Sequence, residues 1–185
     1  ATLARKEKPQ GIAALNAQNW GDLGTATAQI GSFWAAVESI QNPGNLGTIL
    51  RTCDAVGASG LILLDDSTDP YDPAAVKASM GSIFTVPHFR ADFEDFRAFL
   101  QRSPNLTAIG TSDKASESVF EVAYPSTVLL LLGSERQGLS PHYVSLCSRM
   151  VRIPMEGACD SLNISVAAGI MLYQIYYHRQ QRRSL

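Results

Sequence analysis

The sequence predicts an α/β protein in which a mostly parallel sheet carries helices on both faces. From Phe33 onward, short apolar runs alternate with segments of helical periodicity, which is typical of parallel strands joined by crossover helices. Each expected helix has a capping residue or a proline near its start. The chain has 185 residues, of which 45% are hydrophobic, and the apolar residues are spread evenly, so one well-packed domain is expected.

Six apolar runs of strand length follow one another along the chain. They cover Phe33–Val37, Gly60–Leu64, Val86–Phe89, Thr107–Ile109, Val128–Leu132 and Val151–Ile153. Between them, apolar residues recur at helical spacing in five segments, which are Leu46–Val56, Asp72–Ser79, Phe93–Gln101, Pro141–Cys147 and Leu162–His178. The first helix is expected to end at Gly57, since glycine commonly terminates helices. In sheets of this class, ligands bind beyond the carboxyl ends of the strands.

Residues 1–30 are expected to form a linker or an N-terminal arm, and residues 31–185 the folded domain. The first segment is rich in Ala, Gln, Asn, Gly and Thr and has little periodicity. Basic residues gather in it at Arg5, Lys6 and Lys8, and again after the last helix at 178–183. A solvated tail is the favoured interpretation of both clusters, and a phosphate-binding role is the alternative.

The composition argues against several classes of protein. A formal net charge of -2 and a pI near 5.9 give none of the basic surface that grips nucleic acid by charge alone, so any RNA or DNA contact must be local. Cys53, Cys147 and Cys159 have no paired spacing and lie far from the histidines, so neither a zinc site nor a disulfide framework is expected. No apolar run is long enough for a signal peptide or a membrane span, and a soluble, cytoplasmic protein is expected.

The first polar segment, Asn42–Thr52, follows the first expected strand and runs into the first helix. Asn45 is expected near the helix start, and Arg51 follows six residues later. Six residues are fewer than two helical turns, so both side chains can reach nearly the same side of the helix. The alternative is a capping asparagine and an unrelated surface arginine.

The second polar segment ends the buried run Val128–Leu132. Gly133 and Gly138 bracket Glu135, which places a carboxylate at the carboxyl end of a central strand. That position is the expected one for a ligand contact in a parallel sheet. The alternative is a Glu135 that pairs with Arg136 or caps the following helix.

The third polar segment, Arg152–Ser165, joins the last strand to the last helix. Ser161 is expected to cap that helix and Asn163 to lie in its first turn, where backbone N–H groups are unpaired. Taken alone, both residues have a structural explanation. Three strand-end loops that each combine glycine with Asn, Ser, Glu or Arg are more than a core needs, and together they predict a ligand site. The chain has no phosphate-binding GxxxxGK[ST] loop, no dinucleotide-binding GxGxxG motif and no GxSxG nucleophile turn.

In this order and spacing, the three segments resemble the motifs of the SPOUT superfamily of RNA methyltransferases, specifically the TrmH (SpoU) branch that methylates ribose 2′-hydroxyls. The residues that carry the likeness are Asn45, Gly47, Arg51 and Thr52, then Leu132, Gly133, Ser134, Glu135 and Gly138, then Ile153, Pro154, Met155, Gly157, Ser161, Leu162, Asn163, Ile164 and Ser165. The likeness extends from about Phe33 to the end of the chain.

The resemblance implies an S-adenosyl-L-methionine site built by the loops around Thr111, Gly133, Ile153 and Leu162. It also implies a C-terminal trefoil knot, which sequence patterns alone do not predict, and an obligate homodimer. Members often carry an N-terminal RNA-binding domain, and residues 8–12 resemble the linker that follows it. The chain is therefore expected to be the catalytic part of a longer protein.

The resemblance assigns catalysis to Arg51, surrounded by Asn45, Glu135, Ser161 and Asn163. Because a guanidinium stays protonated up to a pH of about 12, we expect Arg51 to bind an RNA phosphate and stabilise the forming alkoxide rather than act as a simple base. The asparagines and Ser161 would orient the reacting groups by hydrogen bonds.

The function expected from this resemblance is 2′-O-ribose methylation of rRNA or tRNA, with no metal ion. Two alternatives stay open. One is a non-catalytic RNA-binding protein of the same fold, and the other is a methyltransferase that modifies an RNA base.

Overall fold

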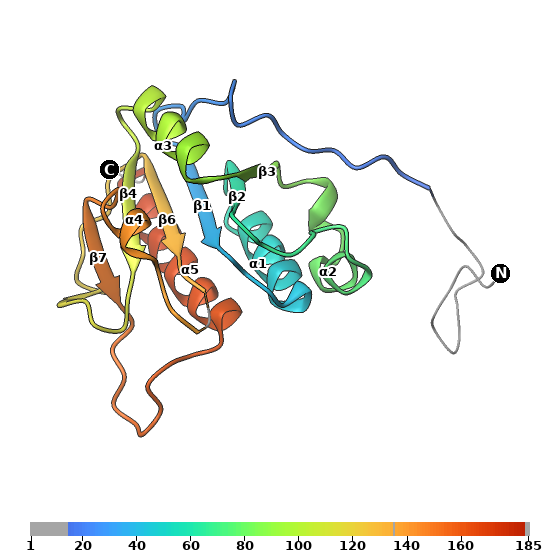
Figure 1. Ribbon diagram of the computed structural model, residues 1–185. Coiled ribbons are helices and arrows are strands. Elements are labelled where there is room, and N and C mark those ends of the chain that lie inside the picture. The colour runs from blue at the N-terminus through green and yellow to red at the C-terminus, as the bar shows by residue number, and fades with distance from the viewer. Residues whose placement is uncertain (1–14, 135, 184–185) are drawn as a thin grey trace.

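In the computed structural model, which describes residues 15–134 and 136–183, seven strands form one sheet. The strands are β1 (Phe33–Glu38), β2 (Gly60–Leu64), β3 (His88–Ala91), β4 (Thr107–Thr111), β5 (Glu117–Ser118), β6 (Val128–Leu132) and β7 (Arg149–Arg152). Their order is β3-β2-β1-β6-β4-β7-β5, and every pairing between them is parallel (Figure 1). The predicted parallel sheet is thus confirmed, and the carboxyl ends of its strands share one edge.

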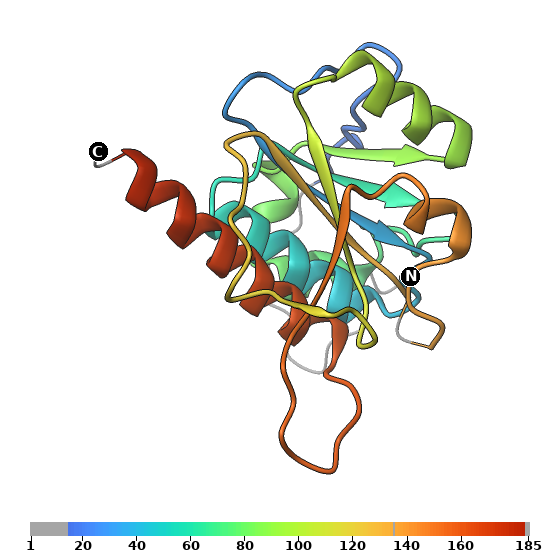
Figure 2. The ribbon, with the colours of Figure 1, turned by 90° about the vertical axis from the view of Figure 1, so that its left-hand side faces the viewer.

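Helices cover both faces of the sheet, as predicted (Figure 2). They are α1 (Pro43–Ala55), α2 (Pro73–Ser79), a short 3₁₀ helix η1 (Ser82–Phe84), α3 (Phe93–Arg102), α4 (Pro141–Val144) and α5 (Ile164–Arg183). Alternate residues of β1 point to opposite sides: Phe33 packs with α1 and α5, whereas Trp34 packs with α3 and α4. The expected trefoil knot stays a prediction.

Short polar side chains start the helices, but two of them differ from the expectation. Asn42, rather than Asn45, caps α1, since its side chain accepts a hydrogen bond from the backbone N–H of Asn45 at 3.1 Å. The expected cap at Ser161 is wrong. The helix α5 begins at Ile164, and the Asn163 carboxamide oxygen accepts from the backbone N–H of Ser165 at 2.9 Å. Asn163 is adjacent to the first helical residue, so it takes the capping position.

One strand was not expected, and several element boundaries differ from the expectation. The strand β5 was not expected, because two polar residues give no apolar run. The strand β3 begins at His88 instead of Val86, and α4 ends at Val144 instead of Cys147. Helix α5 continues to Arg183, beyond the expected end at His178.

The described part of the N-terminal segment lies along the outer edge of the sheet. Gly21 donates its backbone N–H to the carbonyl of His88 at 2.9 Å and bridges Phe89 in parallel register. Leu23 is buried, and its carbonyl accepts from the guanidinium of Arg102 at 2.8 Å. The division of the chain at residue 31 stays a prediction, and the basic residues near the start lie outside the described residues.

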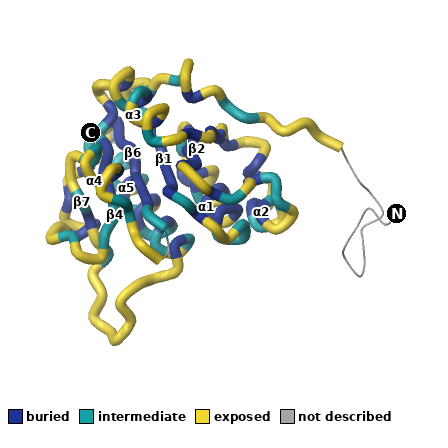
Figure 3. The backbone as a smooth tube through the Cα atoms, in the orientation of Figure 1, coloured by how far each residue is buried: buried dark blue, intermediate teal, exposed yellow. Residues whose placement is uncertain are grey.

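Buried apolar side chains fill both layers around the sheet, while the loop between β7 and α5 is exposed and projects from the body (Figure 3). Cys53 is buried on α1, as expected for a small apolar residue. No described helix combines the length and the apolarity that crossing a membrane requires. Within residues 15–134 and 136–183, His, Cys, Asp and Glu form no group of three that could hold a metal ion.

Candidate active site

A cavity of about 990 Å³ opens beyond the carboxyl ends of β4, β6 and β7. Its described walls come from residues within 111–117, 132–134, 136–139 and 150–155, which lie at or after the ends of these strands, from Val144, and from residues within 160–171, which leads into α5. The strands are neighbours in the sheet and run in the same direction, so their terminal loops meet. This is the position at which ligands bind in open parallel sheets.

The four residues expected to hold a cofactor all line this cavity. Thr111 ends β4, Gly133 directly follows β6, Ile153 directly follows β7, and Leu162 lies two residues before α5. Ser161, expected to take part in catalysis, lines the same cavity. The structure therefore places Ser161 among the expected cofactor positions.

The loop after β6 folds back tightly on itself. Ser134 and Gly138 exchange backbone hydrogen bonds of 3.1 and 3.0 Å, and Gly138 has a positive φ of 66° that favours glycine. A Cβ atom on Gly133 would overlap the backbone of Gly138 and Leu139. Glycine is therefore required at position 133, where the backbone itself forms the cavity wall. Glu135, in the middle of this loop, lies outside the described residues.

Asn45 and Asn163 meet beside the cavity. The Nδ2 atom of Asn163 donates to Oδ1 of Asn45 at 3.1 Å, which joins the first turn of α1 to the residue that caps α5. The N-terminal ends of two helices thus converge on this pair. Unpaired N–H groups and the positive end of the helix dipole make such a place favourable for anions.

Arg51 lies further along α1, is exposed, and is not one of the described residues that line the cavity. Its side chain makes no hydrogen bond or ion pair with any residue that the structure describes. Its guanidinium is thus presented to solvent on the helix that also carries Asn45.

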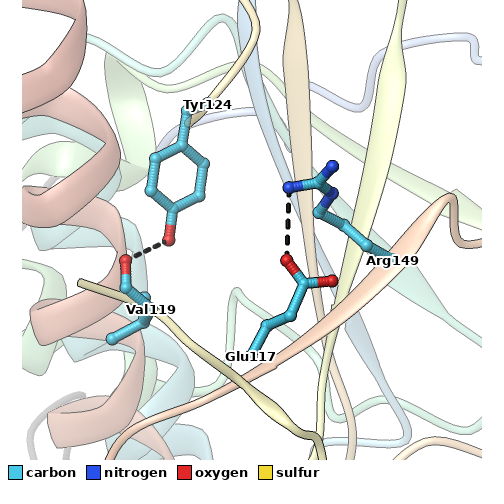
Figure 4. A network of polar contacts seen from close by, with 4 residues as sticks. All are labelled: Glu117, Val119, Tyr124 and Arg149. Atoms are coloured by element: carbon cyan, nitrogen blue, oxygen red, sulfur yellow. Dashed lines mark hydrogen bonds and ion pairs between the residues drawn. The ribbon is translucent and has the colours of Figure 1, made fainter. Parts of the chain in front are cut away.

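Charges of both signs surround the cavity. Asp113, Glu117 and Asp160 contribute carboxylates, whereas Lys114, Arg136 and Arg152 contribute cations. Glu117 also pairs with Arg149 at 3.3 Å, as Figure 4 shows. Both partners are more than 40% exposed, so this pair contributes little to stability.

Sequence reasoning missed several wall residues. Ser112–Ser116 form the polar loop after β4. The only sequence feature that could have predicted their place in the wall is that they follow the end of an expected strand. Met150 and Met171 reach the cavity from β7 and α5, but a methionine in an apolar pattern is indistinguishable from a core residue.

Comparisons with known proteins agree with this architecture. Residues 32–173 match the model of the SpoU rRNA Methylase family. The 23S rRNA (uridine(2479)-2′-O)-methyltransferase of Streptomyces viridochromogenes is 36% identical over 148 residues, which cover 77% of this chain and 52% of that protein. The 23S rRNA (guanosine-2′-O-)-methyltransferase RlmB of Haemophilus influenzae is 32% identical over 144 residues, which cover 77% of this chain and 58% of RlmB.

Solved structures show the same fold. An AdoMet-bound rRNA methyltransferase from Sinorhizobium meliloti superposes with a TM-score of 0.83 at 40% sequence identity, over 87% of this chain and 62% of that one. The SpoU methyltransferase AviRb from Streptomyces viridochromogenes, in complex with the cofactor AdoMet, has a TM-score of 0.78 at 32% identity, over 90% of this chain and 67% of that one. The chain spans only about half to three fifths of the curated relatives named above. Its parallel sheet, its strand-end cavity and these matches show that the chain belongs to the SpoU rRNA methylase family, the TrmH branch of the SPOUT superfamily that its motifs predicted.

Proposed function

We propose that this chain is the catalytic domain of an S-adenosyl-L-methionine-dependent methyltransferase that acts on the ribose 2′-hydroxyl of rRNA or tRNA. One observation carries the proposal: Thr111, Gly133, Ile153 and Leu162 surround a single cavity at the carboxyl edge of the sheet. Solved relatives with the same fold are described as AdoMet-bound.

The cavity fits such a cofactor. Its volume of about 990 Å³ is at the upper end of the range usual for small-molecule sites, about 300–1,000 Å³. Gly133 lines the cavity with backbone atoms alone, which would offer hydrogen bonds to a ligand, and Ile153 and Leu162 supply apolar surface. When bound, S-adenosyl-L-methionine supplies a methyl group already activated by its positive sulfur, so transfer requires neither a metal ion nor a redox group.

The chain's own residues would act on the other reactant, the ribose hydroxyl. A hydroxyl is a weak nucleophile until its proton leaves or its developing negative charge is stabilised. Arg51 would bind the adjacent RNA phosphate and stabilise that charge, since its guanidinium remains protonated. Asn45 and Asn163, fixed to one another, would orient the substrate, and the proton would leave to phosphate or water. Glu135 and Ser161 are proposed to help orient Asn45 and the substrate.

The substrate is proposed to be rRNA or tRNA because the named relatives methylate rRNA. The net charge of -2 allows this chain only local contacts with the RNA. An RNA-binding domain ahead of residues 1–30 would supply the remaining contacts. Such an enzyme would work in the cytoplasm, where it meets these RNAs.

A second copy of this chain is the proposed partner of α5. One side of α5 packs against the sheet, yet Val166, Ile170, Tyr173 and Tyr177 form a second apolar row on the other side. Three of these side chains are at least half exposed, at 50%, 52% and 58% for Val166, Tyr173 and Tyr177. The row starts beside Ala167, which lines the cavity, so a homodimer through α5 would border the active site.

The proposal is tested by incubating the protein with isotopically labelled S-adenosyl-L-methionine and unmodified rRNA or tRNA, followed by nucleoside mass analysis. A methyl group on ribose supports it. A methyl group on a base would instead indicate the base-modifying alternative. Calorimetric binding of the cofactor without methyl transfer to any RNA would indicate a non-catalytic member of the family.

A further inference from the structure

Glu38, the last residue of β1, is the one buried carboxylate in the described part of the chain, with 8% of its surface exposed. Its Oε2 atom accepts a hydrogen bond of 2.9 Å from the backbone N–H of Ser140, 102 residues away in sequence. Burying a charge is costly unless hydrogen bonds compensate. The contact with Ser140 therefore stabilises both Glu38 and the segment that it holds.

A second contact holds the same segment. The buried Tyr143 hydroxyl donates to Oδ1 of Asp65, which directly follows β2, at 3.0 Å. Burial, followed by the hydrogen bond to Asp65 and the nearby negative charges, raises the pKa of Tyr143 well above its usual range. The hydroxyl therefore keeps its proton and remains a donor.

The segment held by these contacts is short and forms part of the cavity wall. Helix α4 has only four residues and no side-chain cap, so it cannot be stable on its own. Leu139, two residues before α4, and Val144, its last residue, line the cavity. Between them, Ser140 binds the last residue of β1 and Tyr143 binds the residue that follows β2. The wall is thus tied to the rigid centre of the sheet.

We propose that these two contacts, Glu38 with Ser140 and Asp65 with Tyr143, act together as an α4 anchor that positions the cavity wall and thereby sets the affinity for S-adenosyl-L-methionine. The proposal rests on the proposed function of this cavity. Glu38 and Tyr143 are positioning residues, because neither lines the cavity within the described chain. If only a fraction of molecules hold the wall in place, the apparent dissociation constant rises in inverse proportion to that fraction.

The first experiment compares Glu38→Leu with Glu38→Gln. Leucine removes the acceptor for Ser140, whereas the glutamine carboxamide oxygen can still accept from it. We expect Glu38→Leu to weaken cofactor binding about tenfold, the equivalent of one lost buried hydrogen bond. Glu38→Gln should keep most of the wild-type affinity. Calorimetry gives the affinities, and hydrogen exchange of residues 139–144, measured without cofactor, reports directly on the anchor.

If Glu38→Leu does not fold, Ser140→Pro tests the same contact from the other side. Ser140 has φ of -68° and ψ of 155°, a conformation that proline adopts readily and that suits a residue before Pro141. The substitution removes the backbone N–H that donates to Glu38, together with a hydroxyl that does not cap α4. Faster exchange of residues 142–144 and weaker cofactor binding are expected.

Tyr143→Phe tests the second contact, and Tyr124→Phe is its matched control. The Tyr124 hydroxyl is also buried and donates to the carbonyl of Val119 at 2.8 Å (Figure 4), but Tyr124 packs on the α5 face of the sheet. Both substitutions remove one buried hydroxyl. Only Tyr143→Phe is expected to weaken cofactor binding, by about threefold to tenfold, and to accelerate exchange in 139–144.

The outcomes separate this proposal from the proposed function. Unchanged exchange of residues 139–144 in both Glu38→Leu and Tyr143→Phe would overturn the anchor, as would equal effects of the Tyr143 and Tyr124 substitutions on affinity. Absence of cofactor binding by the wild type would overturn the proposed function and, with it, the role of the anchor in affinity. The exchange measurement needs no cofactor, so it still decides whether the contacts hold the wall.

Discussion

The carboxamide of Asn163 donates to the carboxamide of Asn45 at 3.1 Å, although 118 residues separate the two in sequence. Asn163 also accepts from the backbone N–H and the hydroxyl of Ser165 through its own oxygen, at 2.9 and 2.6 Å. One side chain therefore both caps α5 and fixes the orientation of Asn45. These two roles use different atoms, so substitutions can separate them.

We predict that Asn163→Asp removes the hydrogen bond that Asn163 donates to Asn45 while keeping the helix cap. A carboxylate accepts from Ser165 as the carboxamide does, but it has no N–H to donate. Methyl transfer to RNA should fall about a hundredfold, the usual cost of losing one preorganised donor. The free energy of unfolding in urea should stay within about 0.5 kcal/mol of the wild type.

The matched control for that substitution is Asn105→Asp, at an exposed position in the loop before β4. It introduces the same charge far along the chain from the asparagine pair. Equal rates of methyl transfer by Asn163→Asp and Asn105→Asp would show that the Asn45 contact does not contribute to the reaction.

We predict that Arg51→Ala abolishes methyl transfer without changing cofactor affinity. Arg51 is exposed and lies outside the described cavity wall, so calorimetry with S-adenosyl-L-methionine should give a dissociation constant within about twofold of the wild type. The rate should fall at least about a hundredfold, because the developing charge loses its stabilising cation. Arg51→Lys should recover only part of the rate, since an ammonium lacks the planar pair of donors.

Arg97→Ala is the control for Arg51, because Arg97 is exposed on α3 and pairs only with the neighbouring Glu94 among the described residues. A comparable loss of activity in both variants would point to a general effect of lost positive charge on RNA binding. Weaker cofactor binding by Arg51→Ala would contradict the separation of the two sites.

The sequence patterns predicted a ligand site where parallel strands end, and the family resemblance named the residues of the cofactor site. Thr111, Gly133 and Ile153 each follow or end an apolar run of strand length, and a parallel sheet brings such ends together whatever their spacing in sequence. Leu162 follows no strand, so only the family resemblance assigned it to the cofactor site, and the structure places it in the cavity wall.

The contacts that fix the site were not predictable in this way. Glu38 ends a strand and resembles an ordinary solvated acid in sequence, and only the packing of a loop 102 residues away buries it. The capping residue of α5 was misplaced because Ser161 and Asn163 are equally good caps, and the choice depends on where the loop joins the helix. Strand β5 has too few residues to produce any periodicity.

We predict that Gly133→Ala weakens cofactor binding at least about tenfold. The added methyl group would overlap the backbone of Gly138 and Leu139, so the loop must open and its hydrogen bonds between Ser134 and Gly138 must lengthen. Gly169→Ala is the control, since a Cβ atom at that position in α5 meets no atom within 4 Å. Alanine there should raise stability by up to about 1 kcal/mol and leave affinity unchanged. Normal affinity of Gly133→Ala would show that the tight loop is not needed.

We predict that Tyr173→Arg converts a dimer into a monomer in sedimentation measurements. An arginine in the middle of the apolar row of α5 would have to be desolvated in a helix-to-helix interface. The dissociation constant of the dimer should rise at least about a hundredfold. Phe120→Arg is the control, since it replaces another large apolar residue that is 52% exposed but lies outside α5. This variant should still sediment with the mass of the dimer. A wild type that sediments as a monomer at micromolar concentration would contradict the proposed interface.

Burial makes two cysteines resist ionisation. In Cys53, burial and, to a smaller extent, the adjacent charge of Asp54 raise the pKa from 9.0 to about 12. Burial alone raises the pKa of Cys147 from 9.0 to about 12. In the unfolded chain both thiols ionise near pH 9, whereas in the folded protein they stay neutral. Each therefore contributes stability that is fully present below pH 9 and is lost as the pH rises towards 12.

We predict that the free energy of unfolding in urea falls as the pH rises above 9, by up to about 1.4 kcal/mol per pH unit for the buried Cys53 and by less for the partly buried Cys147. Cys53→Ala should be less stable than the wild type at pH 7 by about 1 kcal/mol, owing to the small cavity that it leaves. Between pH 9 and 11 it should lose stability less steeply, because it lacks one ionising group. Cys159→Ala, at an exposed position, should follow the wild-type curve. Parallel curves for Cys53→Ala and the wild type would show that the buried thiol does not set the alkaline limit of stability.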